Sequence, residues 1–123
     1  MRESDVATQS KHVLIVDDDE MLTQLIERML HELGCTVSVA SSLPTGLAAL
    51  EGERPDFVLL DVNLHGKFCY PIADRLEELE IPYSFMTAYN GVATDGPYKD
   101  SPFIRKPLAP DSIKNTLFAT FGN

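Results

Sequence analysis

Short apolar runs alternate with amphipathic stretches along this chain. The run at residues 12–16, HVLIV, is almost continuously apolar, which is typical of a strand covered on both faces. Comparable short strands are predicted at residues 36–40, 57–60, 83–86 and 103–105. Most of the stretches between them carry apolar residues at three-and-four spacing, which predicts helices rather than further strands.

Four helices are predicted, and residues at their ends support the assignment. The first covers residues 21–33 and is stopped by Gly34. Ser42 can cap a second helix, which ends at Gly52. A third covers residues 70–80, and the last has Pro110 and Asp111 in its first turn.

Strands and helices that alternate in this way predict an α/β fold. The expected architecture is a doubly wound, five-stranded parallel sheet with helices on both faces. A chain of 123 residues is long enough for one core but too short for two. Residues 1–11, MRESDVATQSK, are mostly polar, and we expect a flexible lead-in there. The domain is expected to comprise residues 12–123.

Polar side chains follow the predicted strands at the points where these end. Asp17 and Asp18 follow the first strand, Asp61 the third, Thr87 the fourth and Lys106 the fifth. In doubly wound sheets the ligand site lies beyond the carboxyl ends of the strands. Singly, each residue is as well explained as a helix-terminal acid, a turn residue or a solvated side chain. Together, these residues predict a ligand site at the carboxyl ends of the strands.

The chemistry of this set points to phosphate. Neighbouring carboxylates repel one another unless a cation lies among them, and Mg²⁺ prefers carboxylate and phosphate oxygens. An ammonium group and a hydroxyl suit a phosphoryl group. An ionised aspartate attacks phosphorus without a separate base, so Asp61 is the expected nucleophile. Asp19 and Glu20 are better explained as helix N-terminal acids.

Four sequence pieces carry a resemblance to a known family. They are VDDDE at residues 16–20, LLDVNL at 59–64, FMTAY at 85–89 and KP at 106–107. In this order and spacing, they resemble the receiver domains of bacterial two-component response regulators over residues 11–121. The resemblance implies a flavodoxin-like fold. It also implies a phosphorylation-driven switch that is not an enzyme acting on other molecules. Its phosphodonor would be a histidine kinase or a histidine phosphotransfer protein.

The resemblance also implies roles around the acidic residues. Asp61 resembles the phosphoacceptor. Asp18 and Asp61 would bind Mg²⁺ through their carboxylates, Asn63 through its backbone carbonyl, and Asp17 through ordered water. His65, four residues after Asp61, can approach the phosphate, but a loop histidine is more often solvated.

Further roles concern the switch. Thr87 would bind the phosphoryl group and move with it, and Lys106 would pair with it. Phe103 occupies the position of the aromatic switch residue, although it has no hydroxyl group. The bond between Lys106 and Pro107 matches the place of a cis peptide in receivers.

Two departures from the family pattern affect the expected output. Residues 88–102, AYNGVATDGPYKDSP, hold two glycines and two prolines where a fourth helix is usual, which predicts a loop with at most one helical turn. Receivers that dimerise use the face around that helix, so we expect a monomer. FMTAY resembles the FATGY motif of a mostly single-domain, stress-signalling subgroup, with Ala88 in place of the glycine.

Composition limits the classes of binding partner and indicates the cellular compartment. Ten basic against nineteen acidic residues give a net charge of −9, which disfavours nucleic acid as a partner. No apolar run reaches the length of a membrane span. Cys35 and Cys69 are expected to be buried thiols in a reducing compartment, and a cytoplasmic protein is predicted.

Two other functions fit parts of the pattern. Asp17–Asp19 contains the Asp-x-Asp of a Mg²⁺-dependent phosphohydrolase with an aspartyl nucleophile, but Met21 stands where such enzymes usually carry Thr or Val. The chain is also too short for a substrate-binding cap domain. A degenerate receiver used for docking is disfavoured by the complete set of acids, Thr87 and Lys106.

Overall fold

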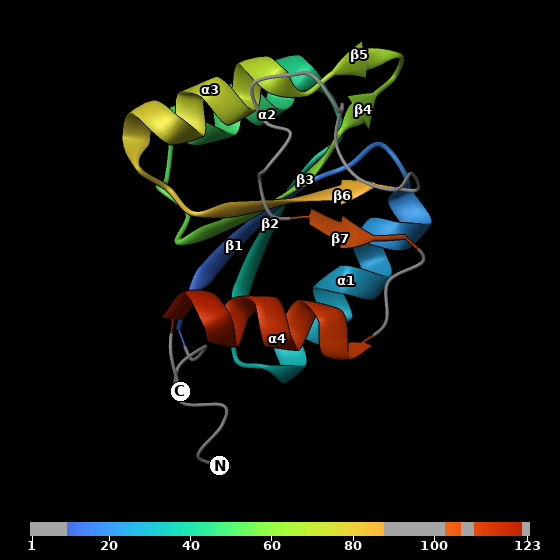
Figure 1. The fold of residues 1–123 in the computed structure, drawn as a ribbon, viewed down its shortest axis with the longest axis vertical. Coiled ribbons are helices and arrows are strands. Elements are labelled where there is room, and N and C mark those ends of the chain that lie inside the picture. The colour runs from blue at the N-terminus through green and yellow to red at the C-terminus, as the bar shows by residue number, and fades with distance from the viewer. Residues whose placement is uncertain (1–9, 88–102, 107–109, 122–123) are drawn as a thin grey trace.

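The computed structural model describes residues 10–87, 103–106 and 110–121. Five parallel strands form one sheet in the order β2-β1-β3-β6-β7. Helices α2 and α3 cover one face of this sheet, and α1 and α4 cover the other (Figure 1). The predicted doubly wound, flavodoxin-like fold is therefore confirmed. The elements of the sheet and its helices are β1 (His12–Val16), α1 (Glu20–Glu32), β2 (Thr36–Ala40), α2 (Leu43–Glu51), β3 (Phe57–Asp61), α3 (Tyr70–Leu79), β6 (Tyr83–Thr87), β7 (Phe103–Arg105) and α4 (Pro110–Phe121).

The strands begin where the apolar pattern placed them, and two of them extend one residue further. β3 includes Asp61 and β6 includes Thr87, so two site candidates are strand residues rather than loop residues. Asp61 is paired with Met86, and Thr87 with Arg105. The sheet therefore fixes the backbone of both residues.

Side-chain caps define the starts of two helices. The Asp19 carboxylate accepts a hydrogen bond from the Leu22 amide and caps α1, as expected for an acid at this position. Ser42 and Thr45 form a reciprocal capping box at the start of α2. After α1 the chain turns at Gly34, whose φ of 86° lies in the left-handed region that glycine adopts without cost.

The sheet divides the apolar core into two layers. Alternate strand residues face opposite sides, so Leu14 and Val16 pack with α2 and α3, while Val13 and Ile15 pack toward α1 and α4. Cys69 lies in the first layer and Cys35 in the second, and both thiols are buried, as predicted. Burial raises the pKa of Cys35 to about 11 and that of Cys69 to about 12.

Helices α2 and α3 approach closely at Gly46. A Cβ atom at this position would lie 2.6 Å from Cδ1 of Ile72 and 3.3 Å from Cγ1 of Val16. Ile72 and Val16 are fully buried, so their side chains have little room to move aside. The contact between the two helices therefore depends on the missing side chain.

A small hairpin that the sequence analysis did not predict precedes α3. Its strands, β4 (Asn63–Leu64) and β5 (Lys67–Phe68), pair in antiparallel fashion. His65 and Gly66 form the turn with φ of 53° and 82°, and two positive values are what a two-residue hairpin turn requires. Phe68 stacks on Tyr70, with ring centroids 5.4 Å apart, which joins the hairpin to α3.

Several predictions concern residues outside the described ranges. They are the flexible lead-in, apart from residues 10 and 11, the loop at residues 88–102, and the peptide bond between Lys106 and Pro107. Among the described helices, none combines the length and apolarity that a membrane span requires.

Candidate functional site

Three aspartates meet at the carboxyl edge of the sheet. β1 and β3 are neighbours, so Asp17, which follows β1, lies beside Asp61 at the end of β3. Asp17, Asp18 and Asp61 each present a carboxylate oxygen, and these atoms lie within 4.8 Å of one another. Asp17 and Asp61 are buried, whereas Asp18 is partly exposed. The predicted cluster of carboxylates is therefore present.

Lys106 brings a positive charge into this cluster. Its Nζ atom lies 2.9 Å from Oδ2 of Asp17 and 3.4 Å from Oδ1 of Asp61. The residue follows β7, and its backbone amide donates to the carbonyl oxygen of Thr87. The end of β6 thus helps to fix the direction in which Lys106 leaves the sheet.

The pKa of Asp61 is raised to about 6. Burial is the largest cause, and the nearby charge of Asp17 adds to it. Lys106 and a backbone hydrogen bond from Asn63 act in the opposite direction but do not cancel the shift. Above about pH 6 the site therefore holds a carboxylate whose charge is only partly compensated.

The pKa of Lys106 is raised as well. Burial alone would lower it, but the hydrogen bond to Asp17 and the charges of Asp17 and Asp61 outweigh that effect. Lys106 is therefore a permanent cation near neutral pH.

Asp17 is held on both of its oxygen atoms. Oδ1 accepts from the Asp19 amide at 2.8 Å, and Oδ2 accepts from Lys106. Asp19 in turn caps α1, so the start of this helix and the site share one hydrogen-bonded turn. Asp17 consequently has little freedom to change its position.

The hairpin reaches Asp18, a contact that the sequence analysis missed. The His65 amide donates to Oδ2 of Asp18 at 3.0 Å, and Nδ1 of the ring lies 3.5 Å from the same oxygen. The amide of Gly66 donates to Oδ1 of Asn63 at 2.8 Å and closes the turn. The ring of His65 remains largely exposed, as expected. The signal in the sequence was the His-Gly pair between Leu64 and Lys67.

A hollow of about 420 Å³ adjoins the acids on the α1 side. Its lining includes Asp17, Asp18, Glu20, Ser41 and His65. This polar opening gives solvent and small solutes a route to the partly exposed Asp18.

Thr87 and Phe103 occupy different ends of their strands. Thr87 is buried at the carboxyl end of β6, on the same edge as the acids. Phe103 begins β7 and is 44% exposed, and it pairs with Phe85 on β6. The structure thus brings Asp17, Asp18, Asp61 and Lys106 into contact and places Phe103 at the opposite end of the strand that leads to Lys106.

The residues present fit a hard divalent cation. Asp17, Asp18 and Asp61 supply oxygen ligands at spacings that one ion can bridge, and oxygen is the donor that Mg²⁺ prefers. The ammonium group of Lys106 contacts Asp17 and Asp61, so one positive charge faces three carboxylates. A second cation at this edge would relieve that imbalance.

Comparisons with known proteins agree with this geometry. The sensory transduction protein LytT of Bacillus subtilis is 30% identical over 112 residues, which cover 85% of this chain and 46% of LytT. The crystal structure of the response regulator PhyR from Brucella abortus is 26% identical with a TM-score of 0.79, and the match covers 94% of this chain and 49% of that one. A structure of the PhyR stress response regulator is 27% identical with a TM-score of 0.80, over 97% of this chain and 47% of that one.

The chain thus spans about half the length of each of these three proteins. The family model of the response regulator receiver domain matches residues 13–118, most of the chain. This chain belongs to the response regulator receiver domain family.

Proposed function

We propose that Asp61 accepts a phosphoryl group and that the chain works as a phosphorylation-driven switch. The observation that carries this proposal is the position of the Asp61 carboxylate, beside Lys106 and two further aspartates at the carboxyl edge of a parallel sheet. Family membership supports the receiver over the phosphohydrolase alternative. We take residues 12–123 as the receiver domain and residues 1–11 as its lead-in.

The transfer follows from the charges of these residues. An oxygen of ionised Asp61 attacks phosphorus in line, and the bond from phosphorus to the donor's imidazole nitrogen breaks. The electron pair of that bond stays on the nitrogen, and the imidazole leaves as a neutral ring whose other nitrogen already carries the proton. The ammonium group of Lys106 lies beside Asp61 and would stabilise the negative charge on the phosphoryl oxygens. Asp17 holds the ammonium group of Lys106 in place.

Mg²⁺ would be held by Asp18 and Asp61, by the backbone carbonyl of Asn63, and by Asp17 through water. Bound there, it would supply positive charge that offsets the negative charge of the transferred group. The hydrogen bond from His65 orients Asp18 before any ion arrives. The hairpin therefore contributes to the shape of the site through its backbone.

The switch would run along two neighbouring strands. The Thr87 hydroxyl donates a hydrogen bond to the new phosphoryl group. Because β6 pairs with β7, a movement of Thr87 would shift β7 as well. Phe103, at the start of β7, is 44% exposed, so an inward movement would remove apolar surface from solvent. Its inward movement would change the surface that a partner reads.

The phosphodonor would be a histidine kinase or a histidine phosphotransfer protein. The first turn of α1 lies beside the acids and exposes Met21 (83%) and, one turn later, Leu25 (47%), an apolar surface suited to a protein donor. The resemblance of FMTAY to a stress-signalling motif and the similarity to the PhyR stress response regulator support a role in that kind of pathway. We place the monomer in the bacterial cytoplasm, without a nucleic-acid partner.

Intact mass spectrometry tests the acceptor. With acetyl phosphate and Mg²⁺ the chain gains one phosphoryl group that hydroxylamine removes, as expected of an acyl phosphate. Asp61→Asn abolishes the gain because an amide is a poor nucleophile. Asp74→Asn, on the exposed side of α3, is the matched control and labels normally.

Undiminished labelling of Asp61→Asn would remove Asp61 from this role. No labelling of the parent chain would favour the degenerate receiver used for docking. Many turnovers of a generic phosphate ester, such as p-nitrophenyl phosphate, would favour the phosphohydrolase.

A further inference from the structure

A second hollow lies at the opposite edge of the sheet, where β3 and β6 begin. It has a volume of about 560 Å³. Its apolar lining comes from the start of β3 and from the turn between α3 and β6, and two glutamates of the α3 end add negative charge. The lining residues used below are Phe57, Glu77, Glu80, Ile81, Pro82 and Tyr83.

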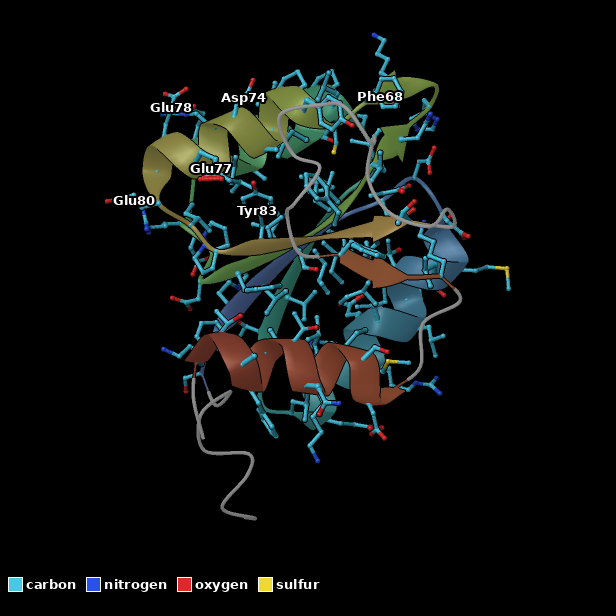
Figure 2. The ribbon with its side chains drawn as sticks, in the orientation of Figure 1. Phe68, Asp74, Glu77, Glu78, Glu80 and Tyr83 are labelled. Carbon is cyan, nitrogen blue, oxygen red and sulfur yellow. The ribbon has the colours of Figure 1, made fainter. Side chains whose placement is uncertain are left out.

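One wall of this hollow is fixed by a hydrogen bond between α3 and β6. The hydroxyl of Tyr83 donates to Oε1 of Glu77 at 3.0 Å. The ring of Tyr83 also packs edge-to-face on Phe85, with centroids 5.4 Å apart. Figure 2 shows Glu77 and Tyr83 facing each other between the helix and the strand. A carboxylate and an aromatic ring are therefore held together at the hollow.

Glu80 also lines the hollow and has a constrained backbone, while its side chain points outward from the end of α3 (Figure 2). Its φ of 56° is left-handed, a conformation that glycine adopts most easily at a helix end. The Glu80 amide donates to carbonyl oxygens of Leu76 and Glu77, and its own carbonyl oxygen accepts from Arg54 at 3.4 Å. Glu80 is therefore a glutamate at a position where glycine would adopt the backbone conformation with less strain.

The charge of the hollow is not balanced by the arginines near it in the described part of the chain. Arg54 contacts the backbone of Glu80, and Arg75 pairs with Glu78 and Glu51. Asp74 and Glu78 lie on the outer side of α3, away from Tyr83 (Figure 2). The whole chain carries a net charge of −9, so anionic membranes and nucleic acids are repelled. The complementary ligand is a cation.

The geometry points to an arginine side chain of a partner protein, flanked by an apolar residue, as the occupant of this hollow. A guanidinium group pairs with a carboxylate through two donors and stacks on an aromatic ring, which matches Glu77 and Tyr83, and the negative charge of Glu80 nearby adds to the attraction. The flanking apolar residue covers Ile81 and Pro82. Lysine has a compact ammonium group that cannot make the planar, two-point contact.

This surface is independent of the phosphoacceptor. β3 begins at Phe57 beside the hollow and ends at Asp61 in the acidic site, so the two sites lie at opposite edges of the sheet. A partner bound at the hollow leaves the acidic site open to a phosphodonor. The test below therefore uses no Mg²⁺ and no phosphodonor, and its result does not depend on the proposed function.

The experiment measures binding of a short capped peptide in which arginine alternates with leucine. Isothermal titration calorimetry measures the affinity. Changes in the protein's amide chemical shifts on titration identify the residues that contact the peptide. We expect the largest shifts at Glu77, Glu80 and Tyr83. A peptide with citrulline in place of arginine has nearly the same shape without the charge, and it should bind at least about fivefold more weakly.

The variant Glu77→Gln combined with Glu80→Gln should weaken binding of the arginine peptide by about fivefold or more. Glutamine retains an oxygen that accepts from Tyr83, so the wall of the hollow is preserved. Glu78→Gln removes one negative charge from the outer side of α3 and is the control, with an expected change below about twofold.

Three results would overturn the proposal. They are shifts centred on another surface, an equal loss of affinity in Glu78→Gln, and equal binding of the citrulline peptide. Unchanged melting temperatures of the variants establish that any loss of affinity does not come from unfolding.

Discussion

The Nζ atom of Lys106 lies 2.9 Å from Oδ2 of Asp17, although 89 positions separate the two residues in the chain. The Asp17 side chain is completely buried and that of Lys106 is 21% exposed. The contact joins the turn after the first strand to the turn after the last strand of the sheet. It therefore offsets part of the negative charge at the acidic edge and also links distant parts of the fold.

Lys106→Gln should destabilise the metal-free protein by about 1–3 kcal/mol, because it leaves the buried carboxylate of Asp17 without its cation. Urea denaturation in the presence of EDTA measures this loss. Lys114→Gln on α4 removes a lysine that lies over the Phe118 ring, and it should cost less than about 1 kcal/mol. Equal losses in the two variants would show that the contact with Asp17 contributes nothing specific.

The pKa of Asp61 predicts a pH-dependent effect of Asp61→Asn. The folded-state pKa of about 6 lies above the ordinary value of 3.8, so the folded protein binds this proton more tightly than the unfolded chain. The corresponding stability is present below about pH 4 and is lost as the pH rises through about 6. Without metal, Asp61→Asn should therefore melt at a higher temperature than the parent at pH 7.5.

The difference between these two melting temperatures should shrink steadily between pH 7 and pH 4.5, where Asp61 becomes neutral in the parent. Melting curves in EDTA across this range provide the measurement. A difference that stays constant with pH would mean that burial does not raise the pKa of Asp61.

Asp18→Asn tests the cation. Mg²⁺ at millimolar concentration should raise the melting temperature of the parent, since an ion that binds only the folded state stabilises it by mass action. Asp18→Asn should remove most of this increase, because Asp18 is the partly exposed member of the carboxylate cluster. Glu32→Gln, which changes an exposed acid at the end of α1, is the control and should keep the full response. An unchanged melting curve of the parent with Mg²⁺ would contradict the proposed metal site.

A double-mutant cycle tests the contact between α2 and α3. Gly46→Ala places a methyl group 2.6 Å from Cδ1 of Ile72, and this overpacking costs about 1–3 kcal/mol, offset in part by the better helix propensity of alanine. Ile72→Val deletes Cδ1 and should cost about 0.5–1.5 kcal/mol alone. The double variant lacks the closest of these contacts, the one with Cδ1 of Ile72, so the two effects should couple by at least about 1 kcal/mol. Additive losses in urea denaturation would show that the helices adjust without strain.

The sequence was sufficient for the sheet because its inner strands β1, β3 and β6 are strongly apolar and its helix ends carry specific residues. The run at β1 is buried along most of its length, and Ser42 and Asp19 cap the helices that follow the strands. Parallel pairing of β1 and β3 then places Asp17 and Asp61 side by side. The acidic cluster was therefore predictable from the sequence.

The hairpin was not predictable by the same reasoning. Its strands have two residues each, which is too short for an alternating pattern, and Leu64 alone is buried in β4. The turn needs a positive φ at His65, a conformation that histidine adopts less easily than glycine. Its contact with Asp18 depends on a backbone amide, a group that every residue except proline carries and that leaves no mark in a sequence.

The position of one thiol in each core layer has a practical consequence. A thiol-reactive dye can reach Cys69 only when the layer under α2 and α3 opens, and Cys35 only when the layer under α1 and α4 opens. Labelling rates of the single-cysteine variants Cys35→Ala and Cys69→Ala would therefore report the opening frequency of each side separately. Cys69 occupies the N-cap position of α3 directly after the hairpin, and the charge of Asp61 contributes to its raised pKa. Its labelling rate would thus follow events at the acidic edge, and the variant that keeps only Cys35 provides the reference for the opposite face.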